Sequence, residues 1–496
     1  MSELLGASTD VLDRIAHSMN TDARLAQDIR ARAQRAVTEL QSSWNGSDLM
    51  RLTQEWDQHG SLLLAGACTA LATCAAQLGA QSTAQRLASG TDAGGSPAKA
   101  APMPPLAPPA MGGSPARTAR WWRSMSPRQQ QQLVTEHPDW VGSRDGVPGT
   151  ARDLANRARV SVERARLLVE KQRIMAAGNR LKVALLGTPS EGVRTRDTVA
   201  LDQVSGKLAS LAAIDLTLAL PGDRQLLMLD LSKPRAQAAI AQGNVDTADN
   251  VAVFVPGMSA NAADGLISGD KNMGELRRQT ELESRRAHTD ESAAAVIWVG
   301  YQAPQMGWDL IGASSVATSL AAREGAAQLV PFLQGIGAAR DKDPHLTLLG
   351  HSYGSTTAGL ALRQSTGVDD AVFFGSPGIG TSHVQDLRLD PGHAYYIEAR
   401  QDLVGDLGRF YGPFGIDPSH LAGIEKASAL DSTVVDPLTG EIRRFTEVTG
   451  HSSYLLDQST SQYNMAVVAA GLPDARVHDD GEGVGDVLSW PIPGTY

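Results

Sequence analysis

The segment that most constrains the fold runs from His345 to Arg363. It opens with a short apolar run, Leu346 to Leu349, which predicts a buried strand. A Gly-x-Ser-x-Gly pentapeptide, Gly350 to Gly354, follows at once, and the small residues from Thr356 onward predict a helix. A strand, a sharp turn and a helix in this order would hold the central serine, Ser352, in a strained turn at the end of a sheet. The flanking glycines are then required, because the strand and the helix approach too closely for a Cβ.

The chain around this segment alternates between apolar runs and helical patterns. Besides Leu346–Leu349, strands are expected in the segments Leu226–Leu231, Asn250–Gly257, Ala293–Gly300, Asp370–Pro377 and Ala394–Ala399. Residues Ala236 to Gly243 are expected to form a short helix or turn, and Ser314 to Ile336 a helix. Because each expected strand is apolar throughout, the sequence predicts an α/β fold with a mostly parallel sheet covered by helices on both faces.

A chain of 496 residues is too long for one ordinary domain. Residues 1–88 are expected to form an all-helical hairpin, whose turn contains Trp44 and Gly46. The following ranges are expected to be a linker rich in Pro, Ala and Gly (89–118), a helical connector (119–222), the α/β domain (223–480) and a C-terminal tail (481–496). Within the connector, Ser126 and Pro127 are expected to start one helix, and residues 150 to about 182 to form a long charged helix.

Composition excludes several classes of function. The net charge is −10 and the basic residues are scattered, so nucleic acid is not an expected partner. Cys68 and Cys74 face different sides of a helix, and we expect neither a disulfide nor a metal site nor a cofactor. The N-terminus does not have the pattern of a signal peptide. The longest apolar stretch, Leu62 to Ala80, is rich in Ala, Gly and Thr, and predicts a buried helix rather than an integral membrane span.

The residues needed to activate Ser352 occur in a suitable order. An unactivated serine is a poor nucleophile and needs a base within hydrogen-bond reach and a third group that orients the base. In α/β-hydrolases the order along the chain is Ser, then Asp or Glu, then His. Asp402 follows the expected strand Ala394–Ala399, with Asp406 as the alternate acid, and His451 lies in a Gly-flanked loop further on. The competing interpretations are a helix N-cap for Asp402 and a structural loop histidine for His451.

A tetrahedral oxyanion at Ser352 would need two preorganised N–H donors. One is expected from the backbone of Tyr353, the residue after the serine. The other is expected from Met258, because Pro256 and Gly257 end an early strand and Gly257 would let the backbone approach a substrate. The competing interpretation is that Pro256 and Gly257 merely terminate the strand.

Several segments, taken together, resemble the DUF1023 family of actinobacterial α/β-hydrolases over about residues 120 to 470. These segments are Trp121–Trp122, Asp145–Pro148, Arg152–Asn156, Val253–Met258, Trp298–Tyr301 with Ala303–Pro304, Gly350–Ser355 and Phe374–Gly378. The resemblance implies an α/β-hydrolase fold with Ser352, Asp402 and His451 as a catalytic triad. It implies no known substrate.

The turn with Trp44 and Gly46 resembles the WXG100 (ESX-type) family of small hairpin proteins. This resemblance implies self-association or a secretion-system partner through the N-terminal hairpin. It also implies either a cytoplasmic location or export by a type VII-like route without a cleavable signal peptide. The Tyr-x-x-x-Asp/Glu export tail of that family does not directly follow the second expected helix, which puts export in doubt.

Three functions fit these features. The first is a serine hydrolase that cleaves a carboxylic ester or related acyl bond in a small molecule. The second is an interaction protein that keeps the scaffold without turnover. The third is an acyltransferase with the same triad, which differs from a hydrolase only in whether an alcohol or water reaches the acyl-enzyme.

Overall fold

The computed structural model describes residues 9–43, the single positions 53, 61, 65, 68, 75 and 76, residues 108–109, and residues 112–479 apart from 185–195, 259, 305–314, 403, 405–413 and 437–438. The chain divides into two compact units, Met1–Met103 and Pro104–Tyr496. In the first unit α1 (Thr9–Ser43) is a long helix, as the sequence predicts. The turn at Trp44 and Gly46, most of the second helix of the hairpin, most of the linker and the tail 481–496 lie outside the described residues.

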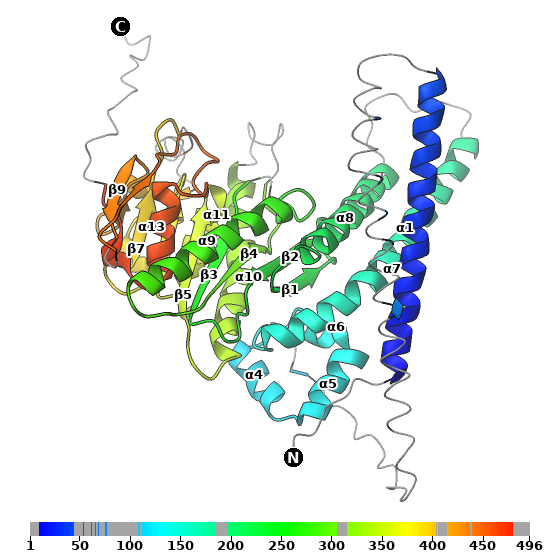
Figure 1. The fold of residues 1–496 in the computed structure, drawn as a ribbon, viewed down its shortest axis with the longest axis horizontal. Coiled ribbons are helices and arrows are strands. Elements are labelled where there is room, and N and C mark those ends of the chain that lie inside the picture. The colour runs from blue at the N-terminus through cyan, green and yellow to red at the C-terminus, as the bar shows by residue number, and fades with distance from the viewer. Residues whose placement is uncertain are drawn as a thin grey trace, which may run out of the picture. The chain divides into compact units, whose positions relative to one another are not determined.

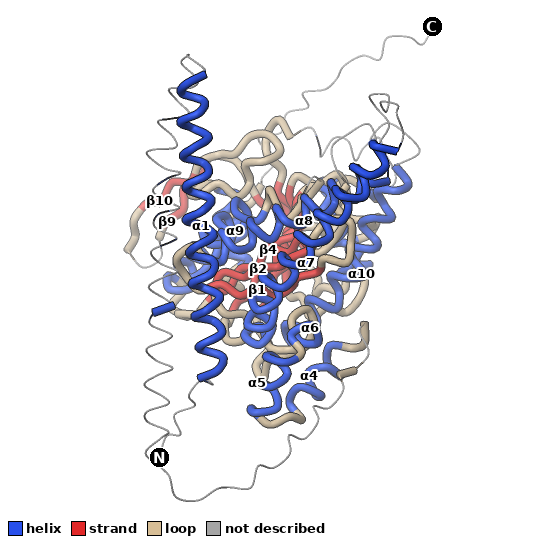
Figure 2. Tube along the Cα trace, turned by 90° about the vertical axis from the view of Figure 1, so that its right-hand side faces the viewer, coloured by secondary structure: helices blue, strands red, loops and turns tan. Residues whose placement is uncertain are grey.

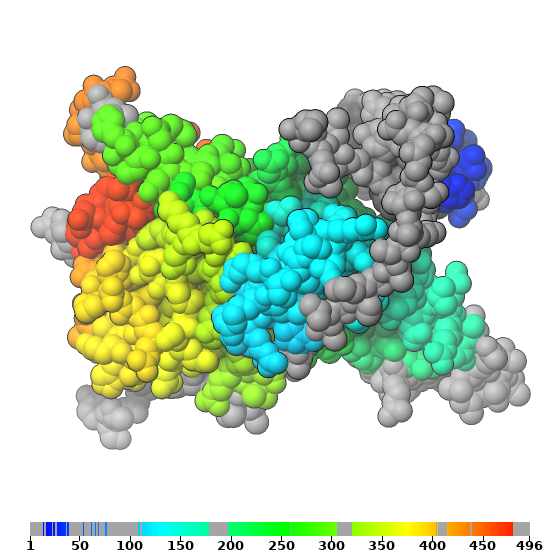
Figure 3. Space-filling model, turned by 90° about the horizontal axis from the view of Figure 1, so that it is seen from below, coloured from blue at the N-terminus to red at the C-terminus, as the bar shows by residue number. Residues whose placement is uncertain are grey.

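The second unit begins with a series of helices. They are α4 (Pro115–Arg123), α5 (Pro127–Glu136), α6 (Pro138–Val141), α7 (Gly149–Ala184) and α8 (Arg196–Leu218). The structure confirms that Ser126 caps α5, because it and Gln129 form a reciprocal capping box. Helix α4 starts at Pro115, inside the range expected to be linker, because Ala119 and Trp122 bury an apolar face there. The surface of α4 to α6, cyan in Figure 3, adjoins the yellow-green surface of the sheet-bearing part of the same unit.

Strands and helices then alternate. The strands are β1 (Arg224–Asp230), β2 (Gln237–Gln242), β3 (Asn250–Val255), β4 (Ala293–Val299), β5 (His345–His351), β6 (Asp370–Phe374), β7 (Ala394–Ile397), β8 (Glu425–Ala427), β9 (Ser432–Val435) and β10 (Ile442–Phe445). The helices between and after them are α9 (Leu266–Arg286), α10 (Ser315–Ala338), α11 (Tyr353–Leu362) and α13 (Thr460–Ala469), with short 3-10 turns at Val384–Asp386, Pro418–His420 and Pro473–Ala475.

In the part of the chain that the structure describes, the main sheet has eight strands in the order β1-β2-β4-β3-β5-β6-β7-β8. All neighbours from β4 to β8 are parallel, whereas β2 pairs antiparallel with both β1 and β4. Strands β9 and β10 form a separate antiparallel ribbon. The predicted mostly parallel sheet is therefore confirmed.

Strand β2 corrects the sequence prediction of a short helix or turn at residues 236–243. Its six residues are all buried, and they pair with strands on both sides. Alanine favours helix in isolation, but burial between two strands overrides that preference.

Helices cover both faces of the sheet, as predicted. One face packs against α8, α9 and α13 through Ile214, Met273 and Met465. The other packs against α10 and α11 through Phe332 and Leu362. Figures 1 and 2 show the strands between these two layers.

The strand register brings three turns to one edge of the sheet. Val255 at the end of β3 lies opposite Gly350 of β5, and His351 lies opposite Phe374 at the end of β6. The turns that follow these strands begin at Pro256, Ser352 and Gly375. Because the carboxyl ends of parallel strands share an edge, all three turns meet there.

Candidate active site

Ser352 sits in a sharp turn between β5 and α11. Its backbone has φ 54° and ψ −131°, a conformation that is costly for a residue with a Cβ. A Cβ at Gly350 would lie 2.8 Å from the Ser355 Cα, and one at Gly354 would lie 2.2 Å from the Val255 carbonyl oxygen. Both glycines are therefore required by close approach. This strand, turn and helix match the geometry that the sequence predicts for a nucleophile elbow.

The turn after β3 packs directly against this serine. A Cβ at Gly257 would lie 2.5 Å from the Ser352 Cβ and 3.0 Å from its Oγ. Met258 is the next residue of this turn. The hydroxyl of Tyr301 donates a hydrogen bond to the Pro256 carbonyl oxygen at 2.7 Å and holds this turn in place.

Asp402 and His451 form a hydrogen-bonded pair. Nδ1 of His451 lies 2.9 Å and 3.0 Å from the two carboxylate oxygens of Asp402. The Asp402 side chain has no solvent exposure, whereas that of His451 is 29% exposed. Because Nδ1 faces a carboxylate, we assign the proton to Nδ1, which leaves Nε2 to accept another. The alternate acid, Asp406, lies outside the described residues.

The electrostatics of Asp402 favour its charged form. Burial by itself raises the pKa of this carboxyl, but hydrogen bonds from His451 and from the Tyr454 hydroxyl outweigh burial and lower the pKa below its usual value. The Tyr454 hydroxyl lies 2.6 Å from Oδ2 of Asp402, and the Val404 N–H lies 3.0 Å from Oδ1. A carboxylate with these donors stays ionised and can stabilise an imidazolium.

His351, the residue before the serine, connects Ser352 to this pair. Its ring centroid lies 4.7 Å from that of His451, and its Nε2 lies 2.8 Å from the His451 carbonyl oxygen. A Cβ at Gly375 would lie 3.2 Å from Nδ1 of His451, and the Ser352 N–H donates to the neighbouring Phe374 carbonyl at 3.1 Å. All the predicted site residues, Ser352, Asp402, His451, Tyr353 and Met258, thus lie at the same edge of the sheet.

Within the described residues, no hydrogen bond joins Ser352 to His451, although the two lie around the same turn. Catalytic hydrogen bonds are often long in unliganded structures and shorten when a substrate binds. Sequence reasoning did not identify the contacts of Tyr454, His351 and Tyr301. The available signals were that Tyr454 lies three residues after His451, and that His351 and Tyr301 lie within the segments Gly350–Ser355 and Trp298–Tyr301.

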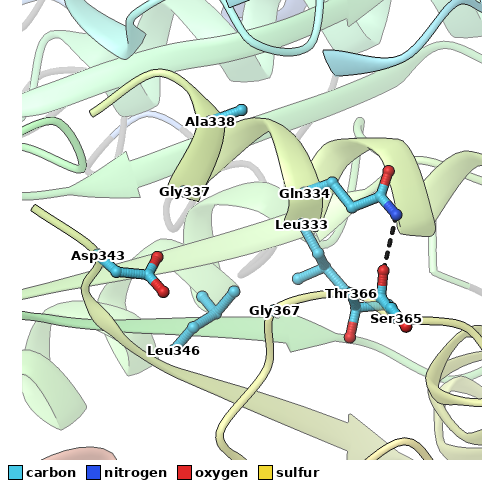
Figure 4. Close-up of a pocket in the computed structure, with 9 residues that line it drawn as sticks. All are labelled: Leu333, Gln334, Gly337, Ala338, Asp343, Leu346, Ser365, Thr366 and Gly367. Atoms are coloured by element: carbon cyan, nitrogen blue, oxygen red, sulfur yellow. Dashed lines mark hydrogen bonds between the residues drawn. The ribbon is translucent and has the colours of Figure 1, made fainter. Parts of the chain in front are cut away.

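A surface hollow of about 240 Å³ lies at the start of β5, the end of that strand remote from Ser352 (Figure 4). Its walls come from the end of α10, the loop after α11 and Leu346 at the start of β5, and the Gln334 side chain donates to the Ser365 carbonyl there. Ser352 follows the other end of β5. The hollow is therefore separate from the site built around Ser352.

Among the described residues, His, Cys, Asp and Glu side chains do not gather in threes that could hold a metal ion. In the same part of the chain, every helix is too short or too polar to cross a bilayer.

Comparisons with known proteins agree with the fold. A family model described as alpha/beta hydrolase matches residues 232–411. An uncharacterized protein of Mycobacterium tuberculosis is 34% identical over 240 residues, which cover 47% of this chain and 88% of the relative, and a protein of Mycobacterium bovis matches equally well. A second uncharacterized protein of Mycobacterium tuberculosis is 29% identical over 429 residues, which cover 79% of this chain and 60% of that relative.

Solved esterase structures show a weaker likeness. An esterase from Pyrobaculum calidifontis has a TM-score of 0.31 and 10% identity, covering 56% of this chain and 93% of the esterase. A cold-adapted esterase from an Arctic intertidal metagenomic library has a TM-score of 0.29 and 13% identity, covering 51% of this chain and 94% of the esterase. A likeness this distant has no bearing on the activity.

Proposed function

This chain belongs to the alpha/beta-hydrolase family, and from that premise we propose that it is a serine hydrolase acting on a carboxylic ester or a related acyl bond. The observation that carries the proposal is the buried hydrogen bond from His451 to Asp402, with the His451 ring beside the residue that precedes Ser352. The proposed site combines a serine in a strained elbow, an imidazole whose Nε2 has no hydrogen-bond partner among the described residues, and an ionised carboxylate. The resemblance to the DUF1023 family supports the same assignment.

In the proposed reaction, the Ser352 Oγ attacks the acyl carbon while Nε2 of His451 takes the hydroxyl proton. Asp402 keeps the imidazole oriented and stabilises its positive charge. His451 then gives the proton to the leaving alcohol, which departs and leaves an acyl group on Ser352. A water molecule, deprotonated by His451, attacks this ester, and His451 then returns that proton to the Ser352 Oγ as the carboxylic acid leaves.

The charge that develops on the acyl oxygen needs donors in place before the reaction. The Tyr353 N–H lies in the first turn of α11, where no carbonyl of the helix can accept it. The Met258 N–H follows Gly257, whose α-carbon packs against Ser352. We propose these two N–H groups as the oxyanion hole. Removal of one such donor typically costs a factor of about 100 to 1,000 in rate.

Labelling with a fluorophosphonate probe tests the proposal. We expect the wild-type protein to be labelled at Ser352, as located by peptide mass analysis, and Ser352→Ala to abolish labelling. His451→Gln should slow labelling by roughly a thousandfold or more, because the base is lost.

Ser161→Ala serves as the matched control, since Ser161 is exposed on α7. It should be labelled like the wild type. A wild-type protein that folds but takes no probe would overturn the proposal in favour of a scaffold without turnover. Hydrolysis and acyl transfer are then separated by adding an alcohol to a p-nitrophenyl ester assay and analysing the acyl product.

A further inference from the structure

The loop that carries His451, residues 449–454, contacts the rest of the domain at both of its ends. At its start, the Gly450 N–H donates to the Arg400 carbonyl oxygen at 2.8 Å. At its end, Tyr454 is 1% exposed and lies among the aromatic rings of the site. We call residues 449–454 the base loop.

Tyr454 links the base loop to the acid. Its hydroxyl donates to Oδ2 of Asp402 at 2.6 Å and accepts from the Ala399 N–H at 2.9 Å. The ring packs against Phe374 with centroids 5.4 Å apart, so the hydroxyl is aimed by packing as well as by hydrogen bonds. Burial and the neighbouring Asp402 raise the pKa of Tyr454 far above its usual value, which keeps the hydroxyl protonated and donating.

His351 links the base loop to the serine. A carbonyl oxygen can only accept, so the 2.8 Å contact with the His451 carbonyl requires a proton on Nε2 of His351. The His351 ring also stacks on Phe374, with centroids 5.1 Å apart. His351 is the last residue of β5, and Ser352 follows it. The His351 imidazole therefore connects the backbone of His451 to the strand that leads to Ser352.

We propose that Tyr454 and His351 are positioning residues: together they set the orientation of His451 towards Ser352, and Tyr454 also limits how much charge Asp402 presents to His451. The inference rests on the proposed function. Besides the residues already named, the charged groups that the described part of the chain places near this cluster include Glu398, whose charge acts on Tyr454, and the pair Arg400 and Glu447, 3.7 Å apart.

The two residues should affect the reaction differently. Without the Tyr454 hydroxyl, Asp402 loses a donor, and its charge then stabilises the imidazolium form of His451 more strongly. The acidic limb of the pH–rate profile should therefore move to higher pH. Loss of the His351 donor removes no hydrogen bond from Asp402, so it should lower the plateau rate without moving that limb.

The experiment measures the second-order rate constant for fluorophosphonate labelling from pH 5 to pH 9. Tyr454→Phe should lower the plateau roughly tenfold, the effect of a lost hydrogen bond to a charged group, and shift the acidic limb upward by roughly half a pH unit or more. Tyr463→Phe is the matched control, because it also removes one buried hydroxyl that donates a hydrogen bond, to the Ala475 carbonyl, away from the site. This control should keep the wild-type profile.

His351→Phe keeps a flat ring but removes the donor, and should lower the plateau roughly tenfold. His351→Gln restores an N–H donor and should recover most of the loss, which a purely structural role would not explain. If Tyr454→Phe fails to fold by circular dichroism, the His351 pair still decides the inference.

The outcomes separate this inference from the proposed function. No labelling of the folded wild type overturns both. Labelled wild type with unchanged rates and profiles in Tyr454→Phe and His351→Phe overturns the positioning role and leaves the serine hydrolase intact. Equal losses in His351→Phe and His351→Gln would overturn the role assigned to the His351 donor.

Discussion

At the scale of single residues, the backbone is strained at two positions of the site: at Ser352 itself and next to Asp402. Ser352 has φ 54°, and Gln401, immediately before Asp402, has φ 62°. Each such conformation costs about 1–3 kcal/mol for a residue with a Cβ. The surroundings must offset this cost, and at Ser352 they include the hydrogen bond from its N–H to the Phe374 carbonyl. Small displacements near Ser352 should therefore affect its reactivity strongly.

Gly257→Ala tests that sensitivity. The added methyl would lie 2.5 Å from the Ser352 Cβ and 3.0 Å from Oγ, so the serine or the turn must move. A displacement of about 1 Å typically costs roughly a hundredfold in rate, and we expect labelling by fluorophosphonate to slow by that factor. Overpacking should also lower the free energy of unfolding by about 1–3 kcal/mol, measured in urea.

Gly206→Ala is the control for this substitution. Gly206 lies in α8, and a Cβ there meets no atom within 4 Å. Alanine should stabilise that helix by about 0.5–1 kcal/mol and leave labelling unchanged. A Gly257→Ala protein with wild-type labelling would show that the turn after β3 does not confine Ser352.

At the scale of elements, α7 explains a motif that the chemistry does not use. Strand β1 forms one edge of the sheet, so its outward N–H and C=O groups lack a strand partner. Side chains of α7 supply the missing bonds: Asp153 accepts from the Leu226 N–H at 2.7 Å, and Asn156 donates to the Leu226 carbonyl at 2.8 Å. Arg157 donates to the Arg224 carbonyl at 2.8 Å. The segment Arg152–Asn156, together with Arg157 directly after it, thus closes the sheet edge.

Asn156→Ala should therefore destabilise the protein without touching the site. Asn156 is fully buried, and its amide also donates to the Gly142 carbonyl. Alanine therefore removes the Asn156 donor from two carbonyl groups, those of Leu226 and Gly142. We expect the free energy of unfolding to fall by about 2–4 kcal/mol, measured by urea denaturation. The rate of Ser352 labelling, measured on folded protein, should stay near that of the wild type.

Gln172→Ala, at an exposed position on the same helix, provides the comparison and should change stability by less than about 0.5 kcal/mol. If both substitutions have the same small effect, the edge of β1 is held by its other bonds, and the role assigned to Asn156 is wrong.

At the scale of the whole molecule, the sequence predicts those parts whose cause is local. The elbow was predictable because Gly350, Ser352 and Gly354 follow one apolar run, and the parallel strands because each is apolar along its length. Strand β2 was not, because only pairing on both sides makes an alanine-rich segment a strand. The hydrogen bond from Tyr454 to Asp402 joins residues 52 positions apart in the sequence, and no local sequence pattern predicts a contact of that kind.

Stability against pH is a further property of the whole chain, and the two histidines of β5 should act on it in opposite directions. Burial, then the nearby His451, lowers the pKa of His351 from 6.5 to about 4. For His345, burial lowers the pKa, but the Asp370 carboxylate outweighs it and the net shift is upward. His351 should therefore destabilise the fold as pH falls, whereas the stabilisation from His345 is present at low pH and lost as pH rises through its raised pKa.

The sign for His351 follows from proton uptake. Between pH 6.5 and about 4 the unfolded chain binds a proton at this residue and the folded chain does not, so acidification favours unfolding. The effect amounts to at most about 3 kcal/mol, and to less because the side chain keeps some contact with solvent. In urea denaturation at pH 4.5 and pH 6.5, His351→Phe should lose less stability on acidification than the wild type. Between pH 6.5 and pH 8.5, His345→Phe should lose less stability than the wild type as the pH rises, because it lacks the contribution that disappears there. If His351→Phe loses as much stability on acidification as the wild type, the imidazole next to Ser352 takes up its proton as readily in the folded protein as in the unfolded chain. Burial then does not keep His351 neutral.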